Sequence, residues 1–166
     1  MMKKSALTVL AISMFAASSA MAAGGKEISL SGFLDNNSSV SMTMVNASFG
    51  MAIKPRLIAK VSVNTIIMDA GGSKSTILGA GVGGKYYFGE AAKSAWVPYV
   101  LADVSLNLMD TGGTSSTGLG LDGGGGVSNF ITEDVSLDAD ARAYYQNFSG
   151  TSLSGVRVTV GVTARF

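Results

Sequence analysis

The chain has 166 residues, of which 47% are hydrophobic, with 12 basic and 11 acidic residues, no histidine and no cysteine. This near balance of charge argues against a nucleic-acid partner, because phosphate binding leaves a basic excess. Without cysteine there is no disulfide framework, and without histidine the chain lacks the usual general base and the commonest metal ligand. We therefore expect neither an enzyme nor a bound cofactor or metal.

The first 22 residues have the features of a secretory signal peptide. Lys3 and Lys4 precede an apolar run at residues 6–17, and Ala20-Met21-Ala22 is a small-residue cleavage site. The run is shorter than the about twenty apolar residues that a membrane-spanning helix needs. We predict that residues 1–22 are removed, and that residues 23–166, which keep 10 basic and 11 acidic residues, form a single domain.

Apolar and polar residues alternate with a period of two through the rest of the chain, which predicts an all-β fold. The eight expected strands are residues 27–35, 40–53, 57–68, 76–88, 96–107, 118–130, 135–147 and 152–166. The phase of the alternation slips near Met44 and Val45, where we expect a β-bulge. Residues 108–117, rich in Gly, Ser and Thr, are expected to form a loop.

The last expected strand shows the clearest alternation of apolar and polar residues. Its even positions from Val156 to Val162 are all valine, and its odd positions carry Arg157 and Arg165. Strands of soluble sheets average about five or six residues, whereas a transmembrane strand needs about nine to eleven. Each of the eight strands can be phased so that no charge faces outward, which lipid requires. The sequence therefore predicts strands that face lipid on one side and a polar lumen on the other.

The aromatic residues collect at the expected strand ends. One group lies toward the end that holds the C-terminus: Phe49, Tyr86, Tyr87, Phe88, Trp96, Tyr99, Phe130 and Phe166. The other group lies toward the opposite end: Phe33, Tyr144, Tyr145 and Phe148. This distribution predicts two interfacial girdles, one at each membrane surface.

Three stretches and the terminal Phe166 give the chain a family likeness. They are ASFGMAIKPRLIAKVSV at 47–63, GGKYYFG at 83–89 and NFITEDVSLD at 129–138. With the expected signal peptide, they resemble the small eight-stranded outer-membrane barrels of OmpA type and the related porin-like superfamily. The resemblance implies an eight-stranded antiparallel up-and-down transmembrane β-barrel in the cell outer membrane, reached through the periplasm.

The same resemblance implies the partners. We expect a monomer that contacts outer-membrane lipid and lipopolysaccharide, and that is delivered by periplasmic chaperones to the barrel assembly machinery. That machinery reads a terminal aromatic residue, which makes Phe166 the expected assembly signal. Known barrel enzymes of this membrane depend on a histidine, which the chain lacks.

A glycine-rich stretch at residues 79–84 satisfies the pattern G-x-G-x-x-G. A phosphate cradle needs a helix after these glycines, but Lys85-Tyr86-Tyr87-Phe88 continues a strand. We instead interpret the glycines as making room inside a narrow barrel, with Tyr or Phe of a neighbouring strand covering them.

The charged residues that the phasing directs into the lumen nearly balance. They are Glu27, Asp35, Asp103, Asp122, Asp138 and Asp140 against Lys60, Lys85, Arg142, Arg157 and Arg165. Hairpins symmetric about their loops would set Asp103 opposite Asp122, and Arg142 opposite Arg157. Opposed like charges destabilise a strand pair, so we predict that these four side chains form one closed cluster that blocks the lumen at mid-height, with water pockets above and below. The alternative is that each charge is hydrated separately in a wet lumen.

An eight-stranded barrel has an interior just wide enough for side chains to fill. The leading functional hypothesis is accordingly a structural protein of the envelope with a largely closed lumen. A porin-like narrow channel for water, ions or small solutes is the alternative. Surface adhesion or ligand binding is a third hypothesis, although it usually uses longer exposed loops.

Overall fold

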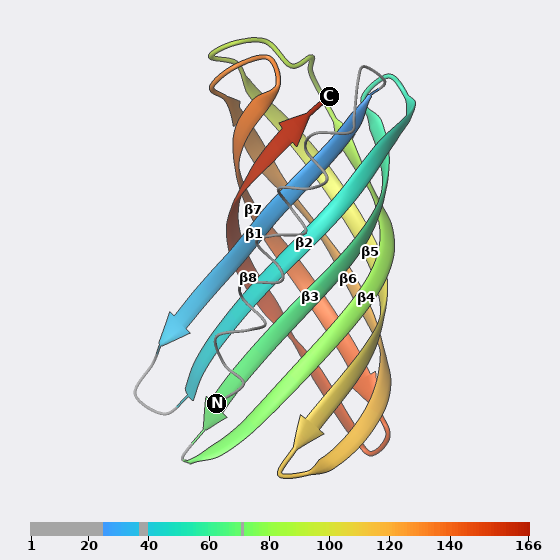
Figure 1. Cartoon of the computed structure of the whole chain (residues 1–166), viewed down its shortest axis with the longest axis vertical. Coiled ribbons are helices and arrows are strands. Elements are labelled where there is room, and N and C mark those ends of the chain that lie inside the picture. The colour runs from blue at the N-terminus through green and yellow to red at the C-terminus, as the bar shows by residue number, and fades with distance from the viewer. Residues whose placement is uncertain (1–24, 37–39, 71) are drawn as a thin grey trace.

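The computed structural model describes residues 25–36, 40–70 and 72–166, which form a closed barrel of eight antiparallel strands (Figure 1). The strands are β1 (Lys26–Asn36), β2 (Val40–Lys54), β3 (Leu57–Ala70), β4 (Ser73–Tyr87), β5 (Trp96–Thr111), β6 (Thr114–Phe130), β7 (Val135–Phe148) and β8 (Thr151–Arg165). No helix within these residues is long and apolar enough to cross a membrane. The expected signal peptide lies outside the described residues and stays a prediction.

Each strand pairs with the next, and β8 returns to β1, as the up-and-down prediction requires. Following the paired residues round the barrel from Leu30, through Ala47, Val63, Ala80, Leu106, Leu119, Asn147 and Ser152, and then extending the β1–β8 register, gives a stagger of ten residues. For eight strands, this stagger corresponds to a tilt of about 40° from the barrel axis. Both ends of the barrel segment lie on one side, where Lys26 and Phe166 exchange backbone hydrogen bonds of 3.2 and 3.0 Å.

Two local predictions are wrong. Residues 108–117 are mostly strand, because β5 and β6 pair as far as Thr111 and Thr114 and are joined only by Gly112 and Gly113, whose φ angles are 59° and 85°. Glycine adopts such positive φ angles without strain, so two residues suffice for the turn. The Ser and Thr residues that suggested a loop belong to the ends of these strands.

The bulge expected near Met44 is also absent, since β2 pairs without interruption through Met44 and Val45. Its register shifts instead between Ala52 and Lys54, beside the turn to β3. The phase did not slip: Met44 points inward and is 2% exposed. The slip was inferred from an apolar residue at a position in phase with polar ones, but part of the lumen is apolar.

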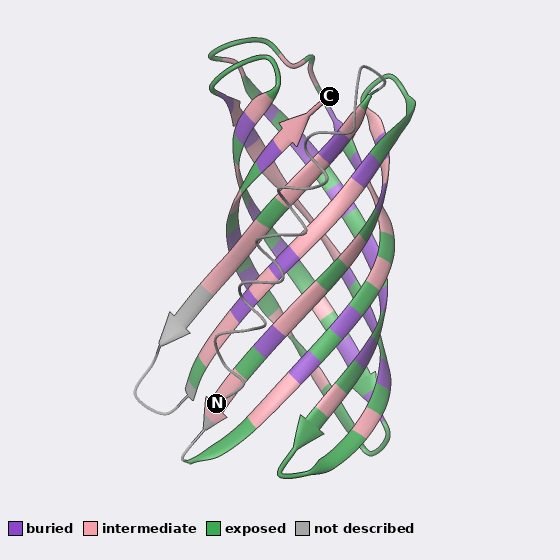
Figure 2. Cartoon of the chain, viewed as in Figure 1, coloured by how far each residue is buried: buried purple, intermediate pink, exposed green. Residues whose placement is uncertain are grey.

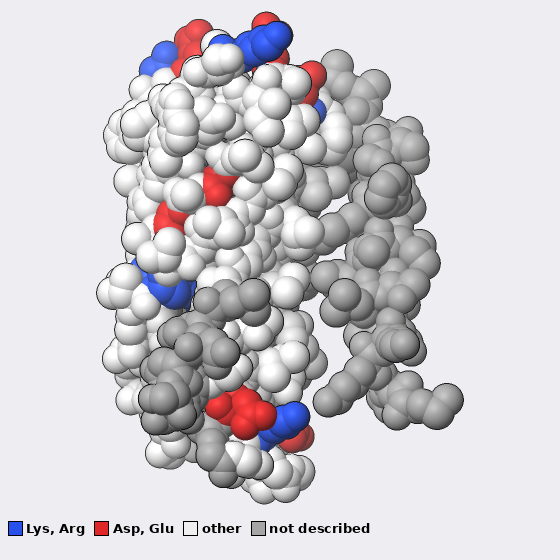
Figure 3. All heavy atoms as spheres, turned by 90° about the vertical axis from the view of Figure 1, so that its left-hand side faces the viewer, with Lys and Arg blue, Asp and Glu red and all other residues white. Residues whose placement is uncertain are grey.

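Buried and exposed positions alternate along the strands (Figure 2). The outward positions form an apolar belt, with large hydrophobic residues such as Val61, Val82, Leu106, Leu121 and Val158 between 54% and 64% exposed. Outward charges in the strands, such as Lys26, Asp69, Lys74 and Asp110, lie within two residues of a strand end. In the space-filling view, many of the charged atoms accordingly gather toward the two ends of the barrel (Figure 3).

Only one of the two expected aromatic girdles forms in the described chain. At the end that holds the C-terminus, Tyr86, Phe88 and Trp96 face outward, but Tyr87, Tyr99 and Phe130 are buried in the lumen. At the opposite end, Phe33, Tyr144 and Phe148 line the lumen, and Tyr145 faces out. Strand neighbours point to opposite faces, so clustering at a strand end predicts an aromatic layer but not the side on which it lies.

Candidate functional site: the filled lumen

The lumen is filled by three layers of side chains. Nearest the C-terminus, aromatic rings alternate with cations, and we call this the aromatic–cation layer. The charge cluster follows at mid-height. An apolar layer closes the end with the short turns.

The aromatic–cation layer is a stack of three rings and two cations. The Arg165 guanidinium carbon lies 4.3 Å from the ring centroid of Tyr87 and 4.5 Å from that of Phe130. The Lys85 Nζ lies 4.6 Å from the Tyr87 centroid and 4.0 Å from the Tyr99 centroid. The cations thus alternate with the rings, and cation–π attraction is strongest at desolvated sites such as this one.

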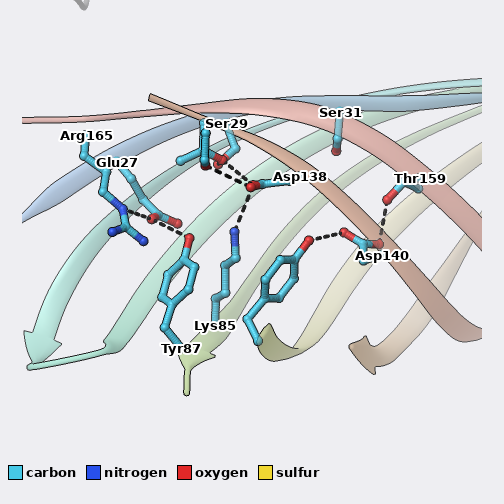
Figure 4. A network of polar contacts seen from close by, with 12 residues as sticks. Glu27, Ser29, Ser31, Lys85, Tyr87, Asp138, Asp140, Thr159 and Arg165 are labelled. Carbon is cyan, nitrogen blue, oxygen red and sulfur yellow. Dashed lines mark hydrogen bonds and ion pairs between the residues drawn. The ribbon is translucent and has the colours of Figure 1, made fainter. Parts of the chain in front are cut away.

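Two carboxylates, Glu27 and Asp138, form ion pairs with these cations (Figure 4). Glu27 accepts a 3.2 Å hydrogen bond from the Tyr87 hydroxyl and lies 3.6 Å from Arg165 Nε. Asp138 accepts a hydrogen bond of 3.0 Å from Lys85 and one of 2.6 Å from the Thr163 hydroxyl. The layer is therefore held by ion pairs as well as by ring contacts.

The charge cluster contains the four predicted residues. Asp103 pairs directly with Asp122 across β5 and β6, and Arg142 pairs with Arg157 across β7 and β8, so both predicted registers are confirmed. Arg157 donates to Asp122, and Arg142 Nη1 lies 3.7 Å from Asp103. Each pair of like charges is thus balanced by the other pair, across the lumen.

Two further residues belong to this cluster. Lys60 Nζ lies 2.9 Å from Asp103 Oδ2. Asp140 receives two hydrogen bonds from Arg142, of 2.6 and 2.9 Å, and one each from the Tyr99 and Thr159 hydroxyls. The sequence placed Lys60 and Asp140 in the lumen but not in the cluster. Asp140 lies two residues from Arg142 on the same face of β7, and Lys60 reaches Asp103 past Gly83, which pairs with both residues.

The described lumen charges can be matched into five ion pairs, and Arg142 makes a further contact with Asp103. The five pairs are Glu27–Arg165, Asp103–Lys60, Asp122–Arg157, Asp138–Lys85 and Asp140–Arg142. Nine of these ten side chains are at most 10% exposed, and the tenth, Arg165, is 21% exposed. The side chain of Asp35, the remaining predicted lumen charge, lies outside the described ones. Within the described residues, no group of three acidic residues could hold a metal ion.

Glycine provides the space for several of these charges. Lys60 pairs with Gly50 on one side and Gly83 on the other, Arg142 pairs with Gly124, and Asp140 pairs with Gly126. A β-carbon added at Gly83 would lie 2.0 Å from Asp103 Oδ1 and 2.3 Å from the Ala102 carbonyl oxygen.

The expectation that aromatic rings cover the glycines is therefore largely wrong. It holds for Gly155, where an added β-carbon would touch the ring of Tyr144. It also holds for Gly118, beside Phe148, whereas Asn and Ser side chains lie beside Gly79, Gly81 and Gly120, and the charged Asp103 lies beside Gly83.

The apolar layer is the part of the lumen that sequence reasoning missed. Met44, Ile66, Ile77 and Phe148 are at most 5% exposed. Further side chains packed against them are Phe33, Met42, Met68, Met109 and Leu153. A signal was present, since Ile66 and Met68 continue the inward phase of Lys60, Ser62 and Asn64 along β3.

Two small cavities flank the charge cluster, each of about 20 Å³, which is room for about one water molecule. The first is polar and is lined by Ser29, Ser48, Lys85 and Asp138, among others. The second lies toward the apolar layer, between Met42, Tyr144 and Arg157. Water pockets above and below the cluster were predicted, and the cavities are in those places. A wider vestibule of about 360 Å³ opens at the C-terminal mouth, above Tyr87 and Arg165.

No protein-family model and no curated protein matches this sequence. The chain is, however, similar to several solved structures. The Neisserial surface protein A, NspA, superposes with a TM-score of 0.64 at 24% identity, over 85% of this chain and 96% of that one. The N-terminal barrel domain of Pseudomonas aeruginosa OprF gives 0.58 at 15% identity, with the same coverages. The Yersinia pestis outer-membrane protein Ail gives 0.52 at 12% identity, over 87% of this chain and 100% of that one.

The fold is that of the small eight-stranded outer-membrane barrels. The resemblance seen in the sequence is thereby confirmed for the architecture. At these identities, the likeness to other small outer-membrane barrels concerns the fold alone.

Proposed function

We propose that this protein is an integral outer-membrane barrel with a structural, non-catalytic role in the envelope and a lumen closed to solutes. The observation that carries this proposal is that every described lumen charge is engaged in an ion pair, in a lumen that an aromatic–cation layer and an apolar layer also fill. A monomer in contact with outer-membrane lipid and lipopolysaccharide, assembled by the barrel machinery, is part of the same proposal.

The outer surface supports a place in a membrane. Soluble monomers rarely expose apolar patches larger than a few hundred Å². Here large apolar side chains face outward along β3 to β8, including Val63, Leu78, Val104, Leu119 and Leu137, each 49% to 58% exposed. The fold shared with three outer-membrane proteins favours the outer membrane in particular.

The ion pairs support a closed and non-catalytic lumen. The Asp140 carboxylate already accepts four hydrogen bonds, from Arg142, Tyr99 and Thr159. A solute passing the cluster would have to separate buried pairs, and removing one partner from such a pair generally costs about 3–5 kcal/mol. The carboxylates are thus engaged in structural contacts, and general acid or base chemistry would first have to break these contacts.

Single-channel recording in planar bilayers tests the closed lumen. The refolded protein, checked for a heat-modifiable shift on a denaturing gel, should give no conductance steps under conditions in which an open porin gives them. Arg157→Ala should also be silent, because the aromatic–cation and apolar layers remain on either side of the altered cluster. Regular steps from the unsubstituted protein would overturn the proposal and favour the narrow channel.

A further inference from the structure

The vestibule at the C-terminal mouth is large enough to hold a small molecule. Its volume of about 360 Å³ is within the range of ligand-binding pockets. Tyr87 and Arg165 of the aromatic–cation layer form its base, and part of its wall is apolar, from Ala52, Pro55, Ile58 and Ala91. A ligand in a pocket of this kind is oriented by a few polar groups among apolar ones, so the polar groups decide which class of ligand fits.

Arg165 is a fixed and incompletely partnered cation at the base of the vestibule. Its guanidinium carbon lies 4.3 and 4.5 Å from the ring centroids of Tyr87 and Phe130, and these two contacts hold the group in place. Arg165 Nε lies 3.6 Å from Glu27 Oε2, which is longer than a hydrogen bond, and Nε has no hydrogen-bond partner within the described residues (Figure 4). The side chain is 21% exposed and is therefore accessible from the vestibule.

Arg56 lies on the rim of the same vestibule, in a backbone conformation that favours glycine. Its φ angle is 70°, and it follows Pro55 in the turn between β2 and β3. Proline followed by a residue of positive φ is typical of a type II turn, whose third position is usually glycine. The Arg56 side chain donates a 3.1 Å hydrogen bond to Glu90, and both side chains are exposed, at 41% and 83%. Exposed ion pairs contribute little to stability, so this contact does not account for an arginine at a position that favours glycine.

We propose that the vestibule binds a small monocarboxylate with a short apolar body, whose carboxylate is bound by Arg165 and attracted into the cavity by Arg56. The planar fork of a guanidinium binds a carboxylate through two hydrogen bonds. Glu27 and Glu90 each lie beside one of the two arginines, which favours a ligand with a single negative charge. The apolar body then packs against the wall at Ile58.

This site goes beyond the structural role proposed above and is independent of the closed lumen. The aromatic–cation layer lies between the vestibule and the charge cluster, and Phe130 within that layer is 0% exposed. A ligand therefore enters and leaves by the same mouth, at the end of the barrel that holds the C-terminus.

Butyrate is a suitable probe, with butyramide as its neutral isostere. Nuclear magnetic resonance of the isotopically labelled, refolded protein in detergent follows the Tyr87 amide and the Arg165 Nε–H group. Butyrate should shift both signals to saturation, with an affinity at least tenfold higher than that of butyramide. Equal shifts from both compounds, or shifts that never saturate, would overturn the proposal. Inorganic phosphate should bind more weakly than butyrate, and tighter binding of phosphate would overturn the assignment to a monocarboxylate.

Arg56→Gly separates a binding role of this arginine from a structural one. We expect the affinity for butyrate to fall several-fold, while the urea midpoint of unfolding stays unchanged or rises, because glycine adopts a positive φ without strain. Lys54→Gln is the matched control: it removes a positive charge two residues earlier, and Lys54 is exposed but is not among the described residues that line the vestibule. Its affinity should stay within about twofold of the unsubstituted protein. Equal losses from the two variants would show a general attraction of anions and no site.

The double substitution Glu27→Gln with Arg165→Gln tests the base of the vestibule. It removes the arginine together with the neighbouring acid, so no buried charge is left without a partner. The affinity for butyrate, followed through the Tyr87 amide, should fall at least tenfold. A double variant that shows the heat-modifiable gel shift and binds butyrate as tightly as the unsubstituted protein would overturn the proposal. If this variant does not fold, the comparison of butyrate with butyramide and the Arg56→Gly variant still decide.

Discussion

Glycine faces several of the lumen charges across a strand pair, and the absent β-carbon leaves room for them. Asp138 pairs with Gly161, and Gly83 lies between Lys60 and Asp103 on its two neighbouring strands. In a barrel of eight strands, two full side chains on adjacent inward positions would fill the space that an ion pair needs. The glycines at these positions therefore help to accommodate the ion pairs of the interior.

Gly83→Ala should destabilise the barrel by about 1–3 kcal/mol, the range for overpacking a tight interior. The new methyl would lie within 2.3 Å of the Ala102 carbonyl oxygen, and backbone yields less readily than a side chain. Gly84→Ala, on the next residue and the opposite face, is the matched control, because its nearest neighbouring atom is 3.5 Å away. Equilibrium unfolding by urea in detergent or lipid measures both, and equal stability of the two variants would contradict this account.

At the scale of a strand, the two faces have opposite requirements. β6 shows this: Leu121 faces outward and is 54% exposed, whereas Asp122, one residue on, is 9% exposed and bound to Arg157. The alternation from which the strands were predicted arises because outward residues face an apolar environment and inward residues face the lumen. It predicts which residues share a face, but the interior of the barrel changes from polar to apolar along its axis, and that change produced the errors at Met44 and in the aromatic girdles.

Leu121→Arg should cost about 2–4 kcal/mol, because it places a charge against the middle of the hydrocarbon. Ser115→Arg, on the same outward face near the end of β6, should cost about 0–1 kcal/mol, and there the arginine lies near Asp110. Unfolding in lipid vesicles, followed through Trp96, the one tryptophan of the chain, gives both values. If the two substitutions had equal effects, the outward face of β6 would not lie in hydrocarbon.

At the scale of the whole molecule, closure and strand order could be predicted because every strand alternates and the two ends of the barrel segment must meet. Hairpin symmetry was enough to set Asp103 opposite Asp122 and Arg142 opposite Arg157. The contact of Lys85 on β4 with Asp138 on β7 could not be predicted, because these strands are not neighbours and the contact depends on the ten-residue stagger round the barrel. The stagger is a property of the closed ring and has no local signal in the sequence.

Phe166 closes that ring at one rung, through its backbone bonds to Lys26. We expect deletion of Phe166 to reduce the amount of barrel inserted in cells, while refolding of the purified chain into detergent stays nearly intact, because six paired rungs between β1 and β8 remain. Heat-modifiable gel shifts of membrane fractions and of refolded protein provide the comparison. Equal insertion of both forms in cells would remove Phe166 as an assembly signal.

The two-residue turn between β5 and β6 is a site at which the barrel could display a foreign peptide. Gly112 and Gly113 have open space where their side chains would stand, and the two longest strands of the barrel hold the hairpin in place on either side. A foreign peptide grafted between these glycines would project from the end opposite the termini, and no native loop residue would have to be replaced. With no cysteine elsewhere in the chain, one thiol in such a graft would be a unique point for attaching a probe.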